Sequence, residues 1–198
     1  MALVDRVKGI LLSPVTEWQV IDGEATTIGA LYAGYIAPLA AIGPIAQVIG
    51  YSIFGVRVPF TGTVMKMPIG SALTAAAVRY VLTLIAVYVL ALIIDALAPT
   101  FGGTKSQIQA LKVAAYSSTA SWLAGIFALL PGLRVLGILG LYSLYLLYLG
   151  LPVLMKSPKE KALGYTVVVI IAAVVLFMII GLVVARFTAM PMGGMMTH

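Results

Sequence analysis

The chain has no cysteine and a single histidine, and Asp, Glu, Lys and Arg together make up only 9% of its 198 residues. Without thiols it has no disulfide framework, no thiolate metal site and no cysteine nucleophile. Soluble domains usually contain about 25% charged residues, so an ordinary soluble surface is excluded. The sequence also lacks a Ser-His-Asp set, paired catalytic carboxylates, an HExxH motif and a phosphate-binding glycine loop. We therefore expect a protein that is not an enzyme and has neither a metal site nor a cofactor.

Long apolar runs are what the chain has in abundance. Hydrophobic residues make up 62% of it, and its mean hydropathy is +1.13. At ~1.5 Å per helical residue, about twenty residues cross a hydrocarbon core of ~30 Å. Runs of this kind fall at residues 27–54, 69–98, 107–130, 135–155 and 163–187. The sequence predicts an all-α polytopic membrane protein in which residues 27–187 form five transmembrane helices. The alternating pattern at residues 55–68, with its proline and glycine, indicates either a small hairpin or an irregular cap on the membrane surface.

Residues 1–26 are predicted to form a short amphipathic segment in the membrane interface. Apolar side chains recur there at helical spacing, at Leu3, Val4, Val7, Ile10 and Leu11. Ser13 and Pro14 predict a second helix, with Ser13 as its N-cap and Pro14 in its first turn.

Trp18 on this second helix is expected to anchor it at the interface. Two roles are open for the segment as a whole. It either cushions the bundle or offers a docking surface to a cytoplasmic protein partner through Glu17, Asp22 and Glu24.

The basic residues are distributed unequally between the two sides of the predicted bundle. If the N-terminus is cytoplasmic, seven face the cytoplasm, namely Arg6, Lys8, Lys105, Lys112, Lys156, Lys159 and Lys161, and four face outward, namely Arg57, Lys66, Arg134 and Arg186. Because cytoplasmic flanks retain positive charge, we expect the N-terminus inside and the C-terminus outside. The net charge of +6 then follows from topology, without a nucleic-acid partner. Lys156, Lys159 and Lys161 are expected to meet anionic lipid head groups, at about 1 kcal/mol each.

Two ionisable residues, Arg79 and Asp95, lie in the second predicted span. They are ~24 Å apart along one helix and cannot pair directly. Asp95 is expected to reach the cytoplasmic interface. Arg79 needs an acceptor, because an unpaired charge at the centre of a span costs at least ~2.5 kcal/mol. The acceptor is Thr83, a tyrosine or a backbone carbonyl of the first span. We favour the carbonyl, that of Gly34 or Ala40, freed where Pro38 and Pro44 kink that helix.

Hydroxyl groups are concentrated in the third predicted span, at Tyr116, Ser117, Ser118 and Thr119. They either hold helices together or line a polar pocket. The fourth span carries Tyr142, Tyr145 and Tyr148, which are expected to face other helices and to bond the hydroxyls of the third span.

Three segments resemble the Yip domain family, membrane proteins named for their interaction with Ypt and Rab GTPases. They are "LLSPVTEWQVIDGE" (11–24), "ALKVAAYSSTASW" (110–122) and "YSLYLLYLGLPVLMKSPKEKALGY" (142–165). The residues that match the family motifs are Ser13, Pro14, Glu17, Trp18, Glu24, Tyr142, Tyr145, Tyr148, Gly150 and Pro152. Ala120 departs from the pattern, because family members often have proline there.

The resemblance implies five spans with a cytoplasmic N-terminus. Eukaryotic members carry long N-terminal regions and serve in vesicle traffic, whereas only residues 1–26 precede the first span here. We therefore do not expect the GTPase-binding role to transfer. The chain is similar to the short bacterial form, which implies the bacterial inner membrane.

Two functions from different classes remain. The first is a non-enzymatic scaffold or adaptor that organises membrane lipids or a protein partner at the cytoplasmic face, and that can form a homo-oligomer. The alternative is a small transporter or channel that uses Arg79 and the hydroxyls of the third span. A water-accessible cavity that reaches Arg79 would favour the transporter, and tight packing there would favour the scaffold. The Met-rich tail (188–198) is expected to be disordered, with Cu(I) binding by its methionines and His198 as a remote alternative.

Overall fold

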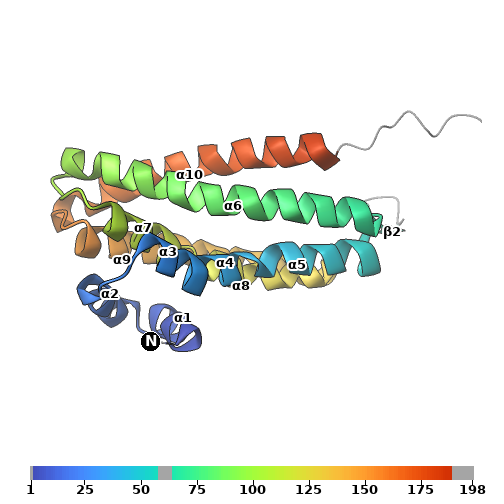
Figure 1. Cartoon of the computed structure of the whole chain (residues 1–198), viewed down its shortest axis with the longest axis horizontal. Helices are drawn as coiled ribbons and strands as arrows, with labels where there is room; N and C mark the ends of the chain where they lie inside the picture. The colour runs from blue at the N-terminus through green and yellow to red at the C-terminus, as the bar shows by residue number, and fades with distance from the viewer. Residues whose placement is uncertain (1, 58–63, 189–198) are drawn as a thin grey trace, which may run out of the picture.

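The computed structural model describes residues 2–57 and 64–188 of the chain. This part consists of helices, one two-residue strand ladder and short connections, and its long helices run antiparallel in one bundle (Figure 1). Two short helices, α1 (Leu3–Leu12) and α2 (Pro14–Gly23), lie beside one end of that bundle. The predicted all-α polytopic architecture is confirmed.

The first span is interrupted where its prolines fall. It consists of α3 (Ile28–Leu31), a π-helical turn η1 (Tyr32–Ile36), α4 (Ala37–Ala40), α5 (Ile42–Ile49) and a second π-helical turn η2 (Gly50–Phe54). Pro38 cannot donate a backbone hydrogen bond to the residue four positions earlier, and the π-helical turn directly precedes α4, whose second residue is Pro38. The helix breaks again at Ala41, just before Gly43 and Pro44.

A small hairpin follows the first span, the first of the two forms that the alternating pattern indicates. Strand β1 (Val56–Arg57) pairs antiparallel with β2 (Val64–Met65), with Val56 opposite Met65. The backbone N–H of Met67 donates to the carbonyl of Tyr51 at 3.1 Å. This bond ties the hairpin to the end of the first span.

The second span and the last one pack along each other. Helix α6 (Ile69–Leu97) continues into a 3-10 turn, η3 (Ala98–Phe101), and α10 covers Lys159–Thr188. The Tyr165 hydroxyl donates to the carbonyl of Ile94, and the ring of Phe101 stacks on that of Tyr165 at 4.8 Å between centroids. These contacts fix one end of the α6–α10 pair, near α2.

The third and fourth spans differ most from regular helices. Residues 107–129 divide into α7 (Gln107–Ser117), α8 (Thr119–Ala124) and the 3-10 helix η4 (Gly125–Leu129), and the fourth span begins as 3-10 helix η5 (Pro131–Leu141) before α9 (Tyr142–Leu154). Four helical stretches of the described chain are long and apolar enough to cross a membrane: Ile28–Phe54, Ile69–Phe101, Val135–Leu154 and Lys159–Arg186. The α7–α8 segment is broken at Ser118 and carries buried polar groups, which explains why it falls short of that criterion.

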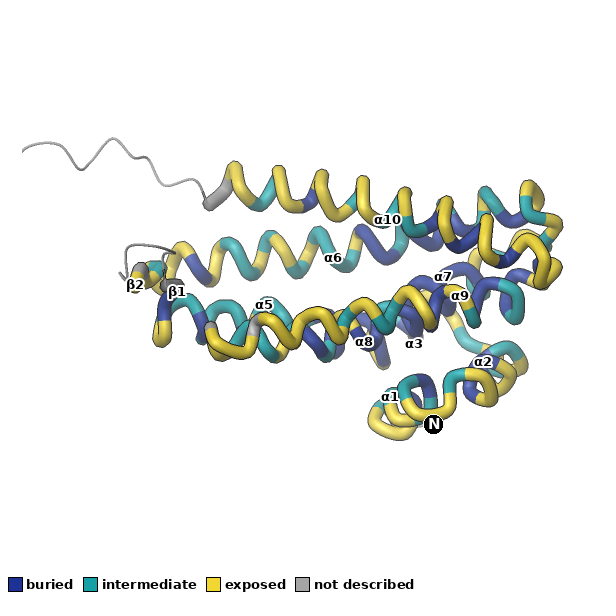
Figure 2. Tube along the Cα trace, turned by 180° about the vertical axis from the view of Figure 1, so that it is seen from behind, coloured by how far each residue is buried: buried dark blue, intermediate teal, exposed yellow. Residues whose placement is uncertain are grey.

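The core is concentrated at one end of the bundle. Figure 2 shows the buried positions gathered toward α2, α7 and α9, whereas the half toward the hairpin is largely intermediate or exposed. The buried cluster includes Trp18, Leu111, Leu146, Leu151 and Tyr165. Exposed apolar side chains, such as those along α10, suit contact with lipid.

Candidate functional site

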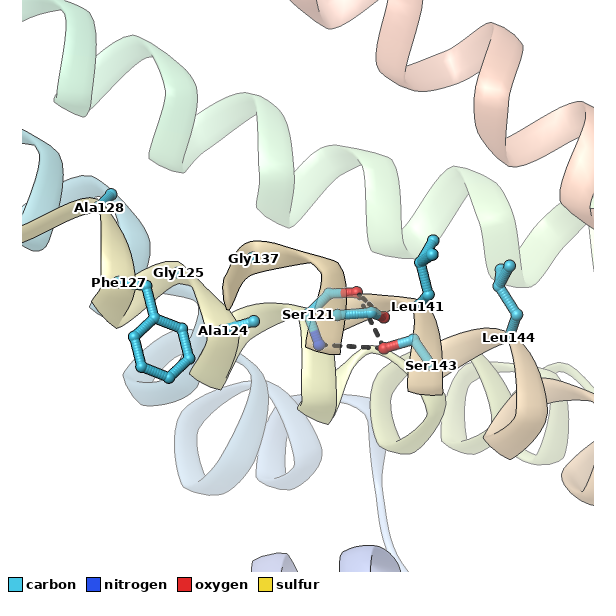
Figure 3. A pocket seen from close by; sticks show the side chains of 10 residues that line it. Ser121, Ala124, Gly125, Phe127, Ala128, Gly137, Leu141, Ser143 and Leu144 are labelled. Atoms are coloured by element: carbon cyan, nitrogen blue, oxygen red, sulfur yellow. Dashed lines mark hydrogen bonds between the residues drawn. The ribbon is translucent and has the colours of Figure 1, made fainter. Parts of the chain in front are cut away.

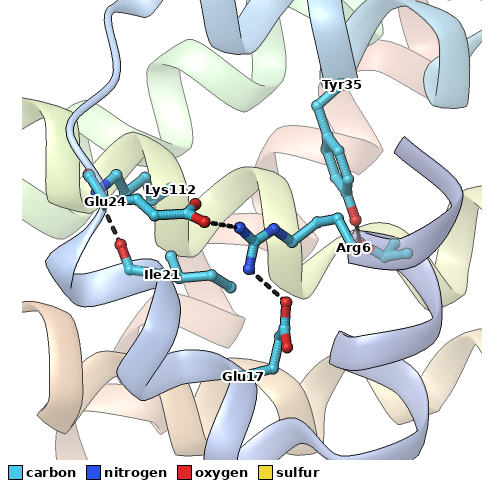
Figure 4. Close-up of polar contacts among 7 residues, drawn as sticks. Arg6, Glu17, Ile21, Glu24, Tyr35 and Lys112 are labelled. Atoms are coloured by element: carbon cyan, nitrogen blue, oxygen red, sulfur yellow. Dashed lines mark hydrogen bonds and ion pairs between the residues drawn. The ribbon is translucent and has the colours of Figure 1, made fainter. Parts of the chain in front are cut away.

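Arg6 holds the two N-terminal helices together. Its side chain is only 4% exposed, and its guanidinium pairs with the carboxylates of Glu17 and Glu24, one on each terminal nitrogen (Figure 4). A charge removed from water is tolerated only when it is paired and hydrogen-bonded. The pairing therefore fixes α1 against α2 and against the residue that follows α2.

Lys112 of α7 completes this arrangement. Its side chain is 3% exposed, and its ammonium donates to the carbonyl of Ile21 at 2.9 Å and to that of Glu24 at 2.6 Å. Backbone carbonyls at the end of a helix lack intrahelical donors, so the ammonium satisfies the end of α2. We call Arg6, Glu17, Glu24 and Lys112 the ion-pair cluster.

Aromatic rings connect the ion-pair cluster to the spans. The Arg6 guanidinium lies 5.6 Å from the centre of the Tyr116 ring, within the range of a cation–π contact. Tyr35 packs edge-on against Tyr116 at 4.6 Å, and its hydroxyl bonds that of Thr119 at 2.7 Å. Trp18 approaches the other side of Tyr116, at 6.3 Å.

Two glycines allow α1, α2 and α9 to approach this closely. A Cβ on Gly9 would collide with the carboxylate of Glu17, and a Cβ on Gly150 would lie 2.6 Å from Trp18 Cζ2. Trp18 is fully buried at 0% exposure, so the expectation that it anchors α2 in the interface is wrong. Because Gly150 has no side chain, the indole fits against α9 instead.

The basic hinge after α9 is joined to the same end of the bundle. Lys156 forms an ion pair with Asp22 at 2.6 Å, and Gln109 also donates to Asp22, at 3.3 Å. The neighbouring carbonyl of Met155 accepts from the backbone N–H of Thr104 at 2.8 Å. Lys159 lies in a groove of about 230 Å³ between α2, α9 and α10.

A second candidate site surrounds Arg79, in the half of the bundle nearer the hairpin. Arg79 lines a cavity of about 260 Å³ together with residues of α5, α8, α9 and α10. Its Nη1 donates to Oε1 of Gln47 at 3.4 Å, and its own carbonyl accepts from the Thr83 hydroxyl at 2.8 Å. Among the residues that the structure describes, no carboxylate lies within ion-pair distance of Arg79. We call this space the Arg79 cavity.

Serines from two helices, Ser121 of α8 and Ser143 of α9, also line the Arg79 cavity. The Ser143 hydroxyl accepts from the backbone N–H of Ser121 at 3.0 Å and lies 2.9 Å from the Ser121 hydroxyl, which donates to the carbonyl of Gly140 (Figure 3). The same two serines border a second hollow of about 420 Å³ between α8, η4 and the start of α9.

The predicted hydroxyl patch is divided between the two sites. Ser117 and Ser118 line the Arg79 cavity, and both hydroxyls donate to the carbonyl of Ala114. Thr119 and Tyr116 face the ion-pair cluster instead. Asp95 is half-buried, and its Oδ1 has no hydrogen-bond partner among the described residues.

The expected acceptor of Arg79 is wrong. Arg79 bonds the Gln47 side chain and not a freed carbonyl of Gly34 or Ala40; the carbonyl of Ala37 accepts from Tyr80 instead. Ser13 is the N-cap residue of α2, as predicted, but its side chain makes no capping bond.

The fourth-span tyrosines also differ from expectation. The Tyr142 hydroxyl donates to the carbonyl of Leu11 in α1, not to the third-span hydroxyls. Tyr145 and Tyr148 are 46% and 40% exposed, so they face outward. Three-residue steps rotate along the helix surface. The Tyr145 ring still packs on that of Tyr142 at 5.5 Å between centroids, and Tyr148 borders the groove beside α2.

Sequence reasoning missed Arg6, Lys112, Gln47, Ser121 and Ser143 as site residues. A signal existed for the two buried cations. Arg6 stands on the apolar face of α1, between Leu3 and Ile10, and Lys112 interrupts a predicted span. Among the described residues, no group of three or more His, Cys, Asp or Glu could hold a metal ion. The Met-rich tail lies outside the described residues.

The apolar helices and their antiparallel arrangement define a polytopic all-α integral membrane protein. The family model of the Yip1 domain matches residues 8–181, so the chain belongs to the Yip family. The match begins within α1 and ends within α10; it includes the Arg79 cavity and Glu17, Glu24 and Lys112 of the ion-pair cluster, whereas Arg6 lies just before it. No curated protein and no solved structure matches the chain.

Proposed function

We propose that this protein is a non-enzymatic membrane scaffold or adaptor that presents α1 and α2 as a fixed platform at the cytoplasmic face. The observation that carries the proposal is the ion-pair cluster. Its buried pairing of Arg6 with Glu17 and Glu24, closed by Lys112 from α7, holds two surface helices in one orientation on the bundle. A helix that served only to cushion the bundle would not need buried charges to fix its orientation.

The outer surface of the platform suits a membrane surface rich in anionic lipid. Val4, Leu12 and Val15 expose apolar side chains on α1 and α2. Lys8 on α1 and Lys159 on α10 are exposed as well. Apolar insertion together with basic residues is how amphipathic helices bind anionic membranes.

The proposal that the platform binds anionic lipid can be tested by measuring which lipids the purified protein retains. The variant with Lys8, Lys159 and Lys161 all replaced by Gln should lose its preference for phosphatidylglycerol over phosphatidylcholine in mixed nanodiscs, measured from the lipids retained. Lys66→Gln, an exposed position at the hairpin end, is the control and should retain the preference. Equal preference in the triple variant and the parent protein would contradict the proposal.

The orientation belongs to this proposal and has its own test. Because the chain has no cysteine, single-cysteine variants give unambiguous labelling. We expect a membrane-impermeant maleimide to label Lys66→Cys, and not Lys159→Cys, in intact bacterial cells. Lys159 is exposed, whereas the neighbouring Ser157 is buried and unsuitable. Labelling of Lys159→Cys alone would invert the orientation and place the platform outside.

A transporter is the second candidate, because a cavity does reach Arg79. The packing toward α2 weighs against it. Leu90 and Leu147 line the cavity, and one turn closer to α2 the next residues on the same faces, Ile94 and Leu151, are fully buried. The cavity therefore has an opening toward the hairpin half and a packed floor. Anion flux in proteoliposomes that disappears in Arg79→Leu would favour the transporter.

A further inference from the structure

The Arg79 cavity has a chemical feature that the scaffold proposal does not use. Arginine carries five N–H donors, and Arg79 makes one hydrogen bond from its guanidinium within the described residues, to the neutral Gln47 at the long distance of 3.4 Å. A cation at membrane depth that has no carboxylate partner is costly. A guanidinium in this state is a binding group for an anion.

Ser143 adds a second donor in the same cavity. Its oxygen already accepts from the backbone N–H of Ser121 and lies beside the Ser121 hydroxyl. The Ser121 hydroxyl has one proton, which the carbonyl of Gly140 or the Ser143 oxygen can accept. The Ser143 hydroxyl can therefore rotate to donate its own proton either to Ser121 Oγ or to a ligand in the cavity. The cavity lining therefore includes a charged donor on α6 and a hydroxyl on α9, and it contains no acidic side chain.

The space around Arg79 continues toward lipid. A second groove, of about 430 Å³, meets the cavity at Arg79, Thr83 and Phe177 and extends between α6 and α10 past Ile180 and Gly181. Apart from Arg79 and Thr83, its lining side chains are apolar. Arg79 lies ten residues along α6 from Ile69, ~15 Å from the hairpin end. A ligand with a polar head and an apolar chain would fit here, with its head in the cavity and its chain in the groove.

We propose that the Arg79 cavity binds a phosphate-bearing anion, with the phosphate between Arg79 and Ser143, and that its source is a membrane lipid whose acyl chain lies in the groove between α6 and α10. Guanidinium groups bind phosphate oxygens in pairs, which the long bond to Gln47 leaves Arg79 free to do. The apolar lining of Leu144, Leu147 and Ala173 suits the methylene groups at the start of the acyl chain. The inference goes beyond the scaffold proposal and concerns the opposite half of the bundle, so either can fail without the other.

The test uses the full-length protein in detergent with defined probes: inorganic phosphate, lysophosphatidic acid and, as a lipid with a blocked phosphate, lysophosphatidylcholine. Binding is followed by native mass spectrometry and by the shift of the unfolding temperature. We expect lysophosphatidic acid to bind one molecule per protein, and Arg79→Gln to weaken this about 10- to 100-fold, the loss of one or two hydrogen bonds to a charged group. Ser143→Ala should weaken it less.

Lys66→Gln is the matched control, because it removes one positive charge at the same end of the bundle without lining the cavity. It should bind like the parent protein. If Arg79→Gln does not fold, Arg79→Lys takes its place and should bind with reduced affinity, since an ammonium retains the charge but not the paired donors. Saturation by inorganic phosphate alone supports the same anion site with a soluble ligand. Equal lysophosphatidic acid binding by the parent protein and Arg79→Gln overturns the proposal.

Discussion

Arg6 and Arg79 are both arginines, but they differ in burial and in the partners that the chain provides for the guanidinium. Arg6 is buried beside two carboxylates and an aromatic ring, whereas Arg79 is exposed on its helix and has a single neutral partner. Around Arg6 the packing is close enough that glycine is required at positions 9 and 150. Around Arg79 the helices enclose empty space.

The contrast separates two uses of a cation in one membrane protein. A cation whose partners are supplied by the chain stabilises the fold, and its removal leaves other buried charges unpaired. A cation whose partners are not supplied contributes little to stability and remains available to a ligand. The following substitutions test this division, from the largest expected effect to the smallest.

Arg6→Leu should have the largest effect. It leaves Glu17 buried without its partner, and breaking one side of a buried pair costs about 3–5 kcal/mol. Thermal unfolding in detergent measures the loss. Lys8→Leu, two residues away on the exposed side of α1, is the control and should unfold near the parent temperature. Equal unfolding temperatures for the two variants would show that the ion-pair cluster does not fix α1.

Gly150→Ala should have an intermediate effect. The new Cβ would lie 2.6 Å from Trp18 Cζ2, so the indole and α2 must move, and overpacking of this kind costs about 1–3 kcal/mol. Gly181→Ala on α10 is the control, because a Cβ there meets nothing within 4 Å. We also expect the variant Ile21→Cys, which is buried in the parent background, to become reactive toward maleimide when Gly150→Ala is added. Protection that persists in the double variant would mean that α2 stays docked.

Arg79→Leu should have the smallest effect on stability. Exposed substitutions usually change the free energy of unfolding by no more than about 0.5 kcal/mol, and the bond to Gln47 is long. The unfolding temperature in lipid-free detergent should therefore stay near that of the parent protein. A loss as large as that of Arg6→Leu would make Arg79 part of the structural framework and would remove the contrast between the two arginines.

Much of the fold can be predicted from the sequence because it depends on local properties. Apolar length determines which segments are helical, and Pro14 stands in the first turn of α2 as its type predicts. The interruptions of the first span follow from Pro38 and from Gly43 and Pro44. These features need no knowledge of what each helix touches.

The partners of the polar residues could not be predicted, because they depend on how the interrupted helices turn. Gln47 faces Arg79 only after a π-helical turn and a break at Ala41. Tryptophan is common at membrane interfaces, but Trp18 is buried because Gly150, more than a hundred residues later in the chain, leaves room for its indole ring. In the sequence, Arg6 is one of the basic residues counted for the orientation. Its contact with Glu17 depends on the turn between α1 and α2, which the sequence pattern does not describe.

The ion-pair cluster can be completed only late in the synthesis of the chain. Arg6, Glu17 and Glu24 leave the ribosome almost together, but the surface that receives them is made of Lys112 and Gly150, which come much later. At about 5–20 residues per second, the interval between Glu24 and Gly150 is roughly 6–25 s. During that time the N-terminal helices have no docking surface, and an insertase or chaperone at the ribosome exit has access to the face of α1 and α2 that packs against the bundle in the finished protein.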